Sequence, residues 1–219
     1  MLLLSIDGAC RRNGKPDCTA AGGLFAYRPD LDFCEVLSVY EYQSTNQRGE
    51  LLALLKALDY VHAANDDEVY IVTDSEYLFN AMTKHWYTNW HAKGWVTASG
   101  DPVKNKDIWM EVTMAMRRIT TDIVFYHIKG HCIPFGRVTA DNLLSRDPSG
   151  RELLEQIRIK FDDCAPTKTT VFQAAQELSE RNNGFRLPDD IFKTFVVINT
   201  LADAVATKVV DKADNSRKR

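Results

Sequence analysis

One stretch, residues 69–75, constrains the fold of this chain more than any other. It reads Val-Tyr-Ile-Val-Thr-Asp-Ser, an apolar and β-branched run that ends in a carboxylate and a hydroxyl. Such a run is typical of a buried strand, and its abrupt end predicts that the strand delivers Asp74 to a polar site. Because Asp-Ser is also common in turns, Asp74 alone does not establish that site.

Three other segments can bring acids to the same place as Asp74. Asp7 follows an apolar run, Glu50 begins an amphipathic stretch, and Asp141 follows Thr139. Each acid taken singly is explained as well by a cap, a turn or a surface charge. Their shared placement at strand ends and helix starts favours convergence, so we expect Asp7, Glu50, Asp74 and Asp141 to meet.

The order of the expected elements predicts an α/β fold with a five-stranded mixed sheet flanked by helices. The helix opened by Thr45 has the clearest periodicity, because leucines and a valine recur on one face up to residue 61. The first three strands should form an antiparallel meander. The expected strands cover residues 1–7, 22–27, 34–42, 69–73 and 122–128, and the expected helices begin at 45, 76, 105 and 139.

The C-terminal part of the chain differs from the rest. Residues 1–148 are expected to form one domain that contains the four acids, and residues 149–219 a small helical appendage. Its longest helix should begin near Pro188 and carry an apolar face, while the polar and basic residues 212–219 should fray. The residues expected on that face are Ile191, Phe195, Ile198, Ala202 and Val205.

Composition narrows the class of protein. The formal net charge of −3 shows no global basic field, so a nucleic-acid partner would need local positive charge. The 5 cysteines are an odd number without a C-x-x-C pair, which predicts reduced thiols and a cytoplasmic protein. No apolar run is long enough to span a membrane, so no membrane association is expected.

Four acids crowded together repel one another unless cations neutralise them. Hard divalent cations prefer oxygen ligands and would remove that repulsion. Two such ions, ~3.5–4 Å apart, can activate a water molecule and stabilise the leaving oxygen of a phosphodiester. The predicted cluster is therefore compatible with two-metal phosphodiester hydrolysis.

Five motifs, taken in chain order, resemble the type 1 ribonuclease H family. They are residues 5–10, 44–51 and 72–77, a tryptophan-rich segment at 84–109, and Lys129-Gly130-His131 followed by Ala140-Asp141. The resemblance covers residues 1–148. It implies a ribonuclease H-like fold with three antiparallel strands and then two parallel ones, and two Mg²⁺ or Mn²⁺ ions. It also implies cleavage of the RNA strand of an RNA–DNA hybrid to 5′-phosphate and 3′-hydroxyl ends.

The resemblance also implies roles for single residues. Asp7, Glu50, Asp74 and Asp141 correspond to the metal-binding catalytic acids. His131 corresponds to a loop histidine that assists proton transfer or product release, a role that a group titrating near neutral pH can fill.

Substrate contacts follow from the same resemblance. Asn13, Asn46 and Gln47 are similar to residues that read ribose hydroxyls in the minor groove, and Thr45 to part of a phosphate pocket. Each is explained nearly as well by ordinary capping or turn duty.

The segment at 84–109 is similar to the basic handle of the family and contains all 4 tryptophans. Trp86 is expected to pack on a sugar, and the other three to pack inside the handle. The lysines interleaved with these rings would attract phosphates. The lysines assigned to the substrate are Lys93, Lys104 and Lys106, with Lys84 beside them.

Two residues depart from the pattern of the family. Arg137 stands where the family usually has asparagine, and Glu76 adds negative charge near the site.

A nuclease of the same fold could instead act on DNA, although Glu50 and the tryptophan handle argue against it. A non-catalytic hybrid-binding module would not need the complete set of acids. The C-terminal helices could bind a protein partner or mediate self-association.

Overall fold

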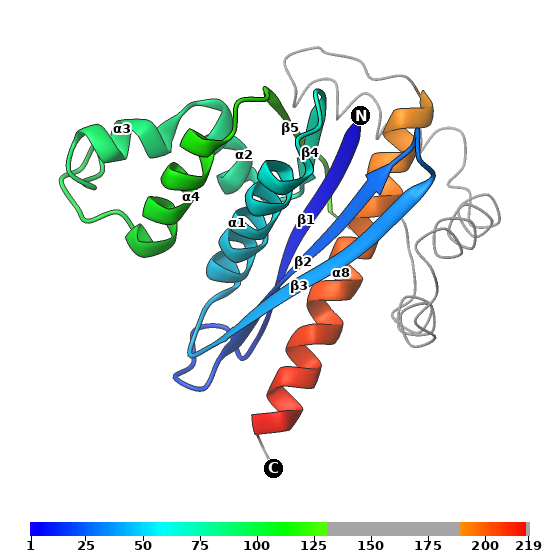
Figure 1. Ribbon diagram of the computed structural model, residues 1–219. Helices are drawn as coiled ribbons and strands as arrows, with labels where there is room; N and C mark the ends of the chain where they lie inside the picture. The colour runs from blue at the N-terminus through cyan, green and yellow to red at the C-terminus, as the bar shows by residue number, and fades with distance from the viewer. Residues whose placement is uncertain (131–188, 218–219) are drawn as a thin grey trace.

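The computed structural model describes residues 1–130 and 189–217. Three strands come first, followed by alternating helices and strands and, after the gap, one long helix (Figure 1). The elements are β1 (Leu2–Arg11), β2 (Thr19–Arg28), β3 (Phe33–Tyr42), α1 (Asn46–Ala64), β4 (Val69–Thr73), α2 (Glu76–Thr83), α3 (Trp86–Ala92), α4 (Lys106–Arg118), β5 (Ile123–His127) and α8 (Asp189–Arg217).

The strands form one mixed sheet in the order β3-β2-β1-β4-β5. β1 pairs antiparallel with β2, and β2 antiparallel with β3, whereas β4 runs parallel to both β1 and β5. The predicted order of three antiparallel strands followed by two parallel ones is confirmed. Because β1 and β4 are adjacent and parallel, their carboxyl ends lie at the same edge of the sheet.

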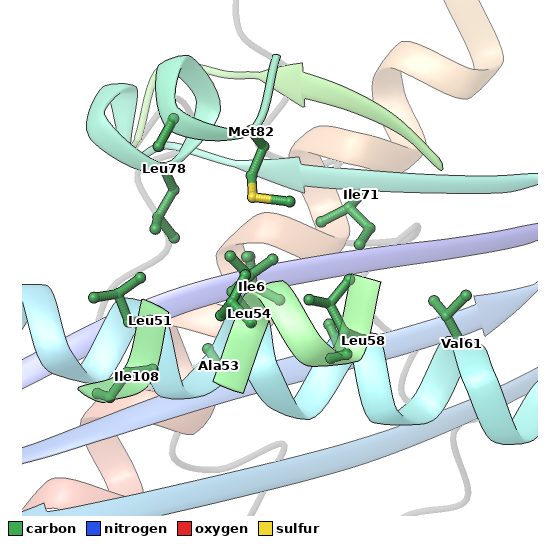
Figure 2. Close-up of a cluster of buried hydrophobic side chains, with 14 of the residues drawn as sticks. Ile6, Leu51, Ala53, Leu54, Leu58, Val61, Ile71, Leu78, Met82 and Ile108 are labelled. Atoms are coloured by element: carbon green, nitrogen blue, oxygen red, sulfur yellow. The ribbon is translucent and has the colours of Figure 1, made fainter. Parts of the chain in front are cut away.

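One face of the sheet is covered by α1, with α2 and α4 around it (Figure 2). Leu54 and Leu58 of α1 are fully buried among Ile6 of β1 and Ile71 of β4. Full burial of such a side chain contributes about 1.5–3 kcal/mol relative to exposure. The predicted leucine stripe is therefore the contact that fixes α1, and Glu50 with it, against the sheet.

The opposite face of β1, β2 and β3 is covered by α8 (Figure 1). The helix comes so close that a Cβ on Gly23 would lie 2.2 Å from the carbonyl oxygen of Ala202. Phe195 is fully buried and packs on Tyr126, with ring centroids 5.4 Å apart. Most of the predicted apolar face is confirmed, since Phe195, Ile198, Ala202 and Val205 are all buried. The side chain of Ile191 lies outside the described residues.

The turn between β1 and β2 is shorter than predicted, because the antiparallel ladder continues to the pair Arg11 and Thr19. This pairing brings Cys10 and Cys18 to a Cα–Cα distance of 6.8 Å, and the two are joined by a disulfide. The prediction of reduced thiols is wrong for this pair. Cys34 is a buried free thiol.

The C-terminal end of α8 is ordered, contrary to the predicted fraying. Ala213 and Asp214 are buried, and Tyr42 donates its hydroxyl hydrogen to the carbonyl of Ala213 at 3.3 Å. Arg11 and Arg12 of the β1–β2 region pair with acids of the last turns. Tertiary contacts therefore hold an end that composition alone marks as polar. The division of the chain at 148/149 falls outside the described residues and stays a prediction.

None of the helices within the described ranges is long and apolar enough to cross a membrane.

Candidate active site

Asp7 lies on β1, the central strand, and is 7% exposed. Its Oδ1 accepts the backbone N–H of Gly8 at 2.6 Å. Burial raises the pKa of Asp7 well above its usual range, and the charges of Asp74, Asp203 and Glu50 raise it further. The site therefore has negative potential before any cation is considered.

Glu50 lies in the first turns of α1, which begins after the N-cap Thr45, and points toward β1 and β4. Its carboxylate accepts hydrogen bonds from Ser75 Oγ at 2.5 Å and from Asn46 Nδ2 at 2.9 Å. A Cβ on Gly8 would lie 2.6 Å from the backbone nitrogen of Glu50, so glycine is needed where β1 passes the helix. Burial raises the pKa of Glu50, and the charge of Asp74 adds to the rise.

Asp74 directly follows β4, as the sequence predicts. His127 Nε2 lies 3.2 Å from the backbone carbonyl of Asp74, and the histidine ring stacks on Phe79 at 5.5 Å. A Cβ on Gly130 would come within 2.2 Å of Asp74 Oδ2, so the chain leaving β5 passes directly beside this carboxylate. Sequence reasoning gave His127 no role, whereas the structure makes it a support for Asp74.

Three of the four predicted acids thus come from β1, α1 and the end of β4 to one place. Asp141 and His131 lie outside the described residues, as does Arg137. The structure adds Asp203 of α8, which acts electrostatically on Asp7. In the sequence Asp203 directly follows Ala202 of the predicted apolar face, and nothing local marks it as a site residue.

An open groove of about 660 Å³ adjoins Glu50. It is lined by several residues that the sequence assigned to the substrate, together with Ser75, Tyr77 and Asn105. Asn13 Oδ1 lies 3.4 Å from the backbone nitrogen of Asn46, which joins the β1–β2 turn to the start of α1. The predicted residues that share the groove are Asn13, Thr45, Asn46, Gln47 and Lys104.

The tryptophan-rich segment packs beside this groove. Trp109 is fully buried and donates Nε1–H to the hydroxyl of Tyr77 at 2.9 Å, and Trp95 is 7% exposed. Trp86 is half-buried between Tyr77 and Trp90. Burial of Trp95 and Trp109 agrees with the expected internal packing.

The lysines predicted to contact the substrate lie at the surface of this segment. Lys93, Lys104 and Lys106 are all exposed. Of the three, only Lys104 lines the groove beside Glu50. The structure therefore places one predicted lysine beside the acids.

Arg48 connects the helix that carries Glu50 to the handle. Its guanidinium donates to Glu41 of β3 at 2.7 Å and to Asp107 of α4 at 2.8 Å. Hydrogen bonds from Arg48 lower the pKa of both partners. These contacts fix the start of α1 relative to the groove wall.

The donor chemistry at this place is that of a hard cation site, since it consists of carboxylate oxygens. Among residues 1–130 and 189–217, however, no three His, Cys, Asp or Glu side chains are arranged so that they could hold a metal ion as they stand. Burial raises the pKa of both Asp7 and Glu50, and the charge of Asp74 raises the pKa of each further. A bound cation would relieve the repulsion between these acids, so the residues fit such a group.

Comparison with known families identifies the family of this chain. The family model described as RNase H matches residues 2–147. The chain belongs to the RNase H family of enzymes. The resemblance found in the motifs is thereby confirmed, and the ribonuclease H-like fold class with it. The match ends before α8, so the family model assigns nothing to that helix.

Curated relatives support the RNase H assignment. A ribonuclease H of Alcanivorax borkumensis is 37% identical over 145 residues, which cover 66% of this chain and 89% of the relative. A ribonuclease H of Rickettsia felis is 33% identical over 156 residues, covering 71% and 94% of the two chains.

Solved structures of RNase H proteins are also similar. LC9-RNase H1, a type 1 RNase H with the type 2 active-site motif, has a TM-score of 0.49 and 24% identity, covering 59% of this chain and 63% of that one. LC11-RNase H1, solved in complex with RNA/DNA hybrid, has a TM-score of 0.45 and 21% identity, covering 59% and 86%. Family membership rests on the sequence match.

Proposed function

We propose that this chain is an endoribonuclease that hydrolyses the RNA strand of RNA–DNA hybrids with two Mg²⁺ or Mn²⁺ ions. The products would carry 5′-phosphate and 3′-hydroxyl ends. The observation that carries the proposal is the convergence of Asp7, Glu50 and Asp74, from three separate elements, in a member of the RNase H family.

The proposed cation ligands are these three acids and Asp141. The cations would supply Lewis-acid stabilisation of charge at the scissile phosphate. Ser75 and Asn46 would orient Glu50 through their hydrogen bonds, and His127 would hold the backbone at Asp74. His131 would accept or release a proton near neutral pH.

The groove beside Glu50 is the proposed seat of the hybrid. Amides of Asn13, Asn46 and Gln47 would hydrogen-bond to ribose 2′-hydroxyls across a wide minor groove, which distinguishes an RNA strand from DNA. Thr45, at the start of α1, would contact a phosphate through its hydroxyl or the helix N-terminus.

The DNA strand would be held by the handle. Trp86 would pack on a sugar, and Lys93, Lys104 and Lys106 would attract phosphates. Because each phosphate contact releases counterions, affinity for the hybrid should fall as salt rises.

The deciding experiment compares an end-labelled RNA–DNA hybrid, a DNA duplex and an RNA duplex, each with Mg²⁺ and with chelator. We expect cutting of the hybrid alone, in the RNA strand and with Mg²⁺ only. Cutting of the DNA duplex would instead support a DNA nuclease of the same fold. Hybrid binding without cutting would support a binding module.

Three predictions from the sequence have no direct structural test. A cytoplasmic location stays a prediction, and the Cys10–Cys18 disulfide argues against the reduced thiols on which it was based. A protein partner for the C-terminal helices is likewise untested. Self-association through those helices is untested too, although α8 already uses one face to cover the sheet.

A further inference from the structure

The helix α8 crosses the sheet at the position of the buried acid of β1. Asp7 is paired with Gly23 across the β1–β2 ladder. A Cβ on Gly23 would lie 2.2 Å from the carbonyl oxygen of Ala202 and 2.8 Å from the nitrogen of Ala206. The turn of α8 that contains Asp203 therefore sits directly on the residue beside Asp7.

Contacts on both sides of this turn fix its position along the strand. Before it, Asn199 is buried and its Nδ2 lies 3.5 Å from Ser5 Oγ, on the same strand as Asp7. After it, Arg11 donates to Asp211 at 2.8 Å, and Arg12 donates to the buried Asp214 at 2.8 Å. A one-residue shift of the helix would break these contacts, so Asp203 is held in place.

Asp203 is half-buried, in a turn whose neighbours Ala202 and Ala204 are buried. After burial and the charge of Asp74, the charge of Asp203 is the next largest cause that raises the pKa of Asp7, ahead of Glu50. A helix that only covered a sheet would be more stable with a neutral residue there. The placement of a carboxylate beside other buried acids therefore suggests a use other than packing.

We propose that Asp203 is a further carboxylate of the catalytic cation site, delivered by α8 from the face of the sheet opposite α1. The proposal rests on the proposed two-cation function of Asp7, Glu50 and Asp74. It gives the chain a second acid after β5, in addition to Asp141, in a segment beyond the matched residues 2–147. It also makes α8 a part of the active site.

Cation binding by the full chain tests the proposal without relying on activity. Mn²⁺ titrations by calorimetry would compare the wild type with Asp203→Asn, Asp141→Asn and the exposed control Asp59→Asn, which lies on α1 and pairs with Arg118. We expect Asp203→Asn to weaken Mn²⁺ binding at least about tenfold, as loss of a site-supporting residue does. Asp59→Asn should bind as the wild type does.

Thermal stability supplies a second test, because the substitution Asp203→Asn should have different effects on Tm with and without Mn²⁺. In chelator, Asp203→Asn should raise Tm, because it removes a charge that repels Asp7. In saturating Mn²⁺, the same variant should gain less stability than the wild type, because it binds the ion more weakly. A merely structural carboxylate would shift Tm equally in both conditions. Asp203→Ser replaces Asp203→Asn if the latter does not fold.

The outcomes separate this proposal from the proposed function. Unchanged Mn²⁺ affinity and parallel Tm shifts in Asp203→Asn would overturn the role of Asp203, even if hybrids are cut. Weakened Mn²⁺ binding in Asp203→Asn supports that role even if wild-type protein cuts no hybrid, which would contradict the proposed function alone. Weakened binding in both Asp203→Asn and Asp141→Asn supports two acids after β5. A wild type that binds no Mn²⁺ would overturn both proposals.

Discussion

Asp7 is an acid of the site whose pKa is raised by both burial and the charges of its neighbours. It is 7% exposed, lies on the central strand and is surrounded by other acids. The folded state therefore keeps its proton to a higher pH than the unfolded chain, in which an aspartate titrates near ~3.9. Stability falls as pH rises from that value through the raised folded pKa, because the unfolded state loses its proton first.

Replacement of Asp7 by Asn should remove this pH-dependent loss. Without divalent cations, Asp7→Asn should be more stable than the wild type at pH 7 by about 1 kcal/mol or more, since each pKa unit corresponds to ~1.4 kcal/mol. The difference should shrink at pH 4. Urea unfolding in chelator at both values measures it, with Asp59→Asn as a control expected within ~0.5 kcal/mol of wild type. If the stability gain of Asp7→Asn over the wild type is smaller at pH 7 than at pH 4, this account is wrong.

Asp74→Asn should separate chemistry from binding. The variant keeps the shape of the side chain but loses the charge, so hybrid cleavage should fall at least about a hundredfold. Hybrid affinity, measured by fluorescence anisotropy in chelator, should change less than about threefold, because Asp74 does not line the groove. Single-turnover cleavage supplies the rate. Full residual activity would refute the assigned role.

The sequence predicts the single residues of the site unevenly. Asp74 is readable because a β-branched run ends in it, and Glu50 because it precedes a strong leucine stripe. Asp203 was not readable, because an isolated acid on an apolar helix face gives no local sign of what it packs against. His127 was missed for the same reason, since its contact with Asp74 depends on the pairing of β5 with β4.

At the level of elements, the end of α8 and the β1–β2 turn hold each other. Asp214 is buried, accepts from Arg12 and lies 3.4 Å from Thr19 Oγ1. Arg12 also contacts Asp17 within the turn. Because this turn carries Asn13, which lines the groove, the helix end supports a predicted substrate contact.

Asp214→Ala should therefore affect both stability and substrate binding. The substitution removes the buried carboxylate that accepts hydrogen bonds from Arg12 and Thr19, so Tm should drop by several degrees. KM for the hybrid should rise more than kcat falls, because the turn moves while the acids do not. The matched control is Asp211→Ala, whose pair with Arg11 is half-exposed and should matter less. Equal effects of the two substitutions would show that burial of the pair is unimportant.

Element boundaries follow the sequence where local signals are strong. Strand β4 and the start of α2 lie where predicted, since Ser75 caps the helix by accepting the N–H of Leu78 at 3.4 Å. The predicted boundaries are wrong where contacts with residues distant in the sequence determine the end of an element. β1 extends to Arg11 because β2 pairs with it, and α8 continues to Arg217 because the β1–β2 turn binds its last residues.

For the whole molecule, α8 is a full layer of the structure. It packs on β1, β2 and β3, opposite α1 (Figure 1). Its side chain Phe195 is completely buried. The sequence predicts a helix with an apolar face but not the surface that this face covers. The described part of the chain shows that this surface is the second face of the catalytic sheet.

Phe195→Ala should therefore be severe. Truncation of a buried phenylalanine costs about 3–5 kcal/mol, from lost burial and the cavity left behind. The matched control Phe33→Ala removes a ring that is 44% exposed on the edge strand and should cost less than about 1 kcal/mol. Denaturant unfolding of both variants measures the difference. Similar losses in both would mean that α8 adds little to the core.

The position of α8 also has a consequence for how the protein is made. During translation β1 leaves the ribosome long before α8. The face of the sheet that α8 covers therefore stays exposed to solvent while the intervening residues are translated. Asp203 arrives in that same late segment. If it belongs to the cation site, that site stays incomplete in a nascent chain until α8 has been translated.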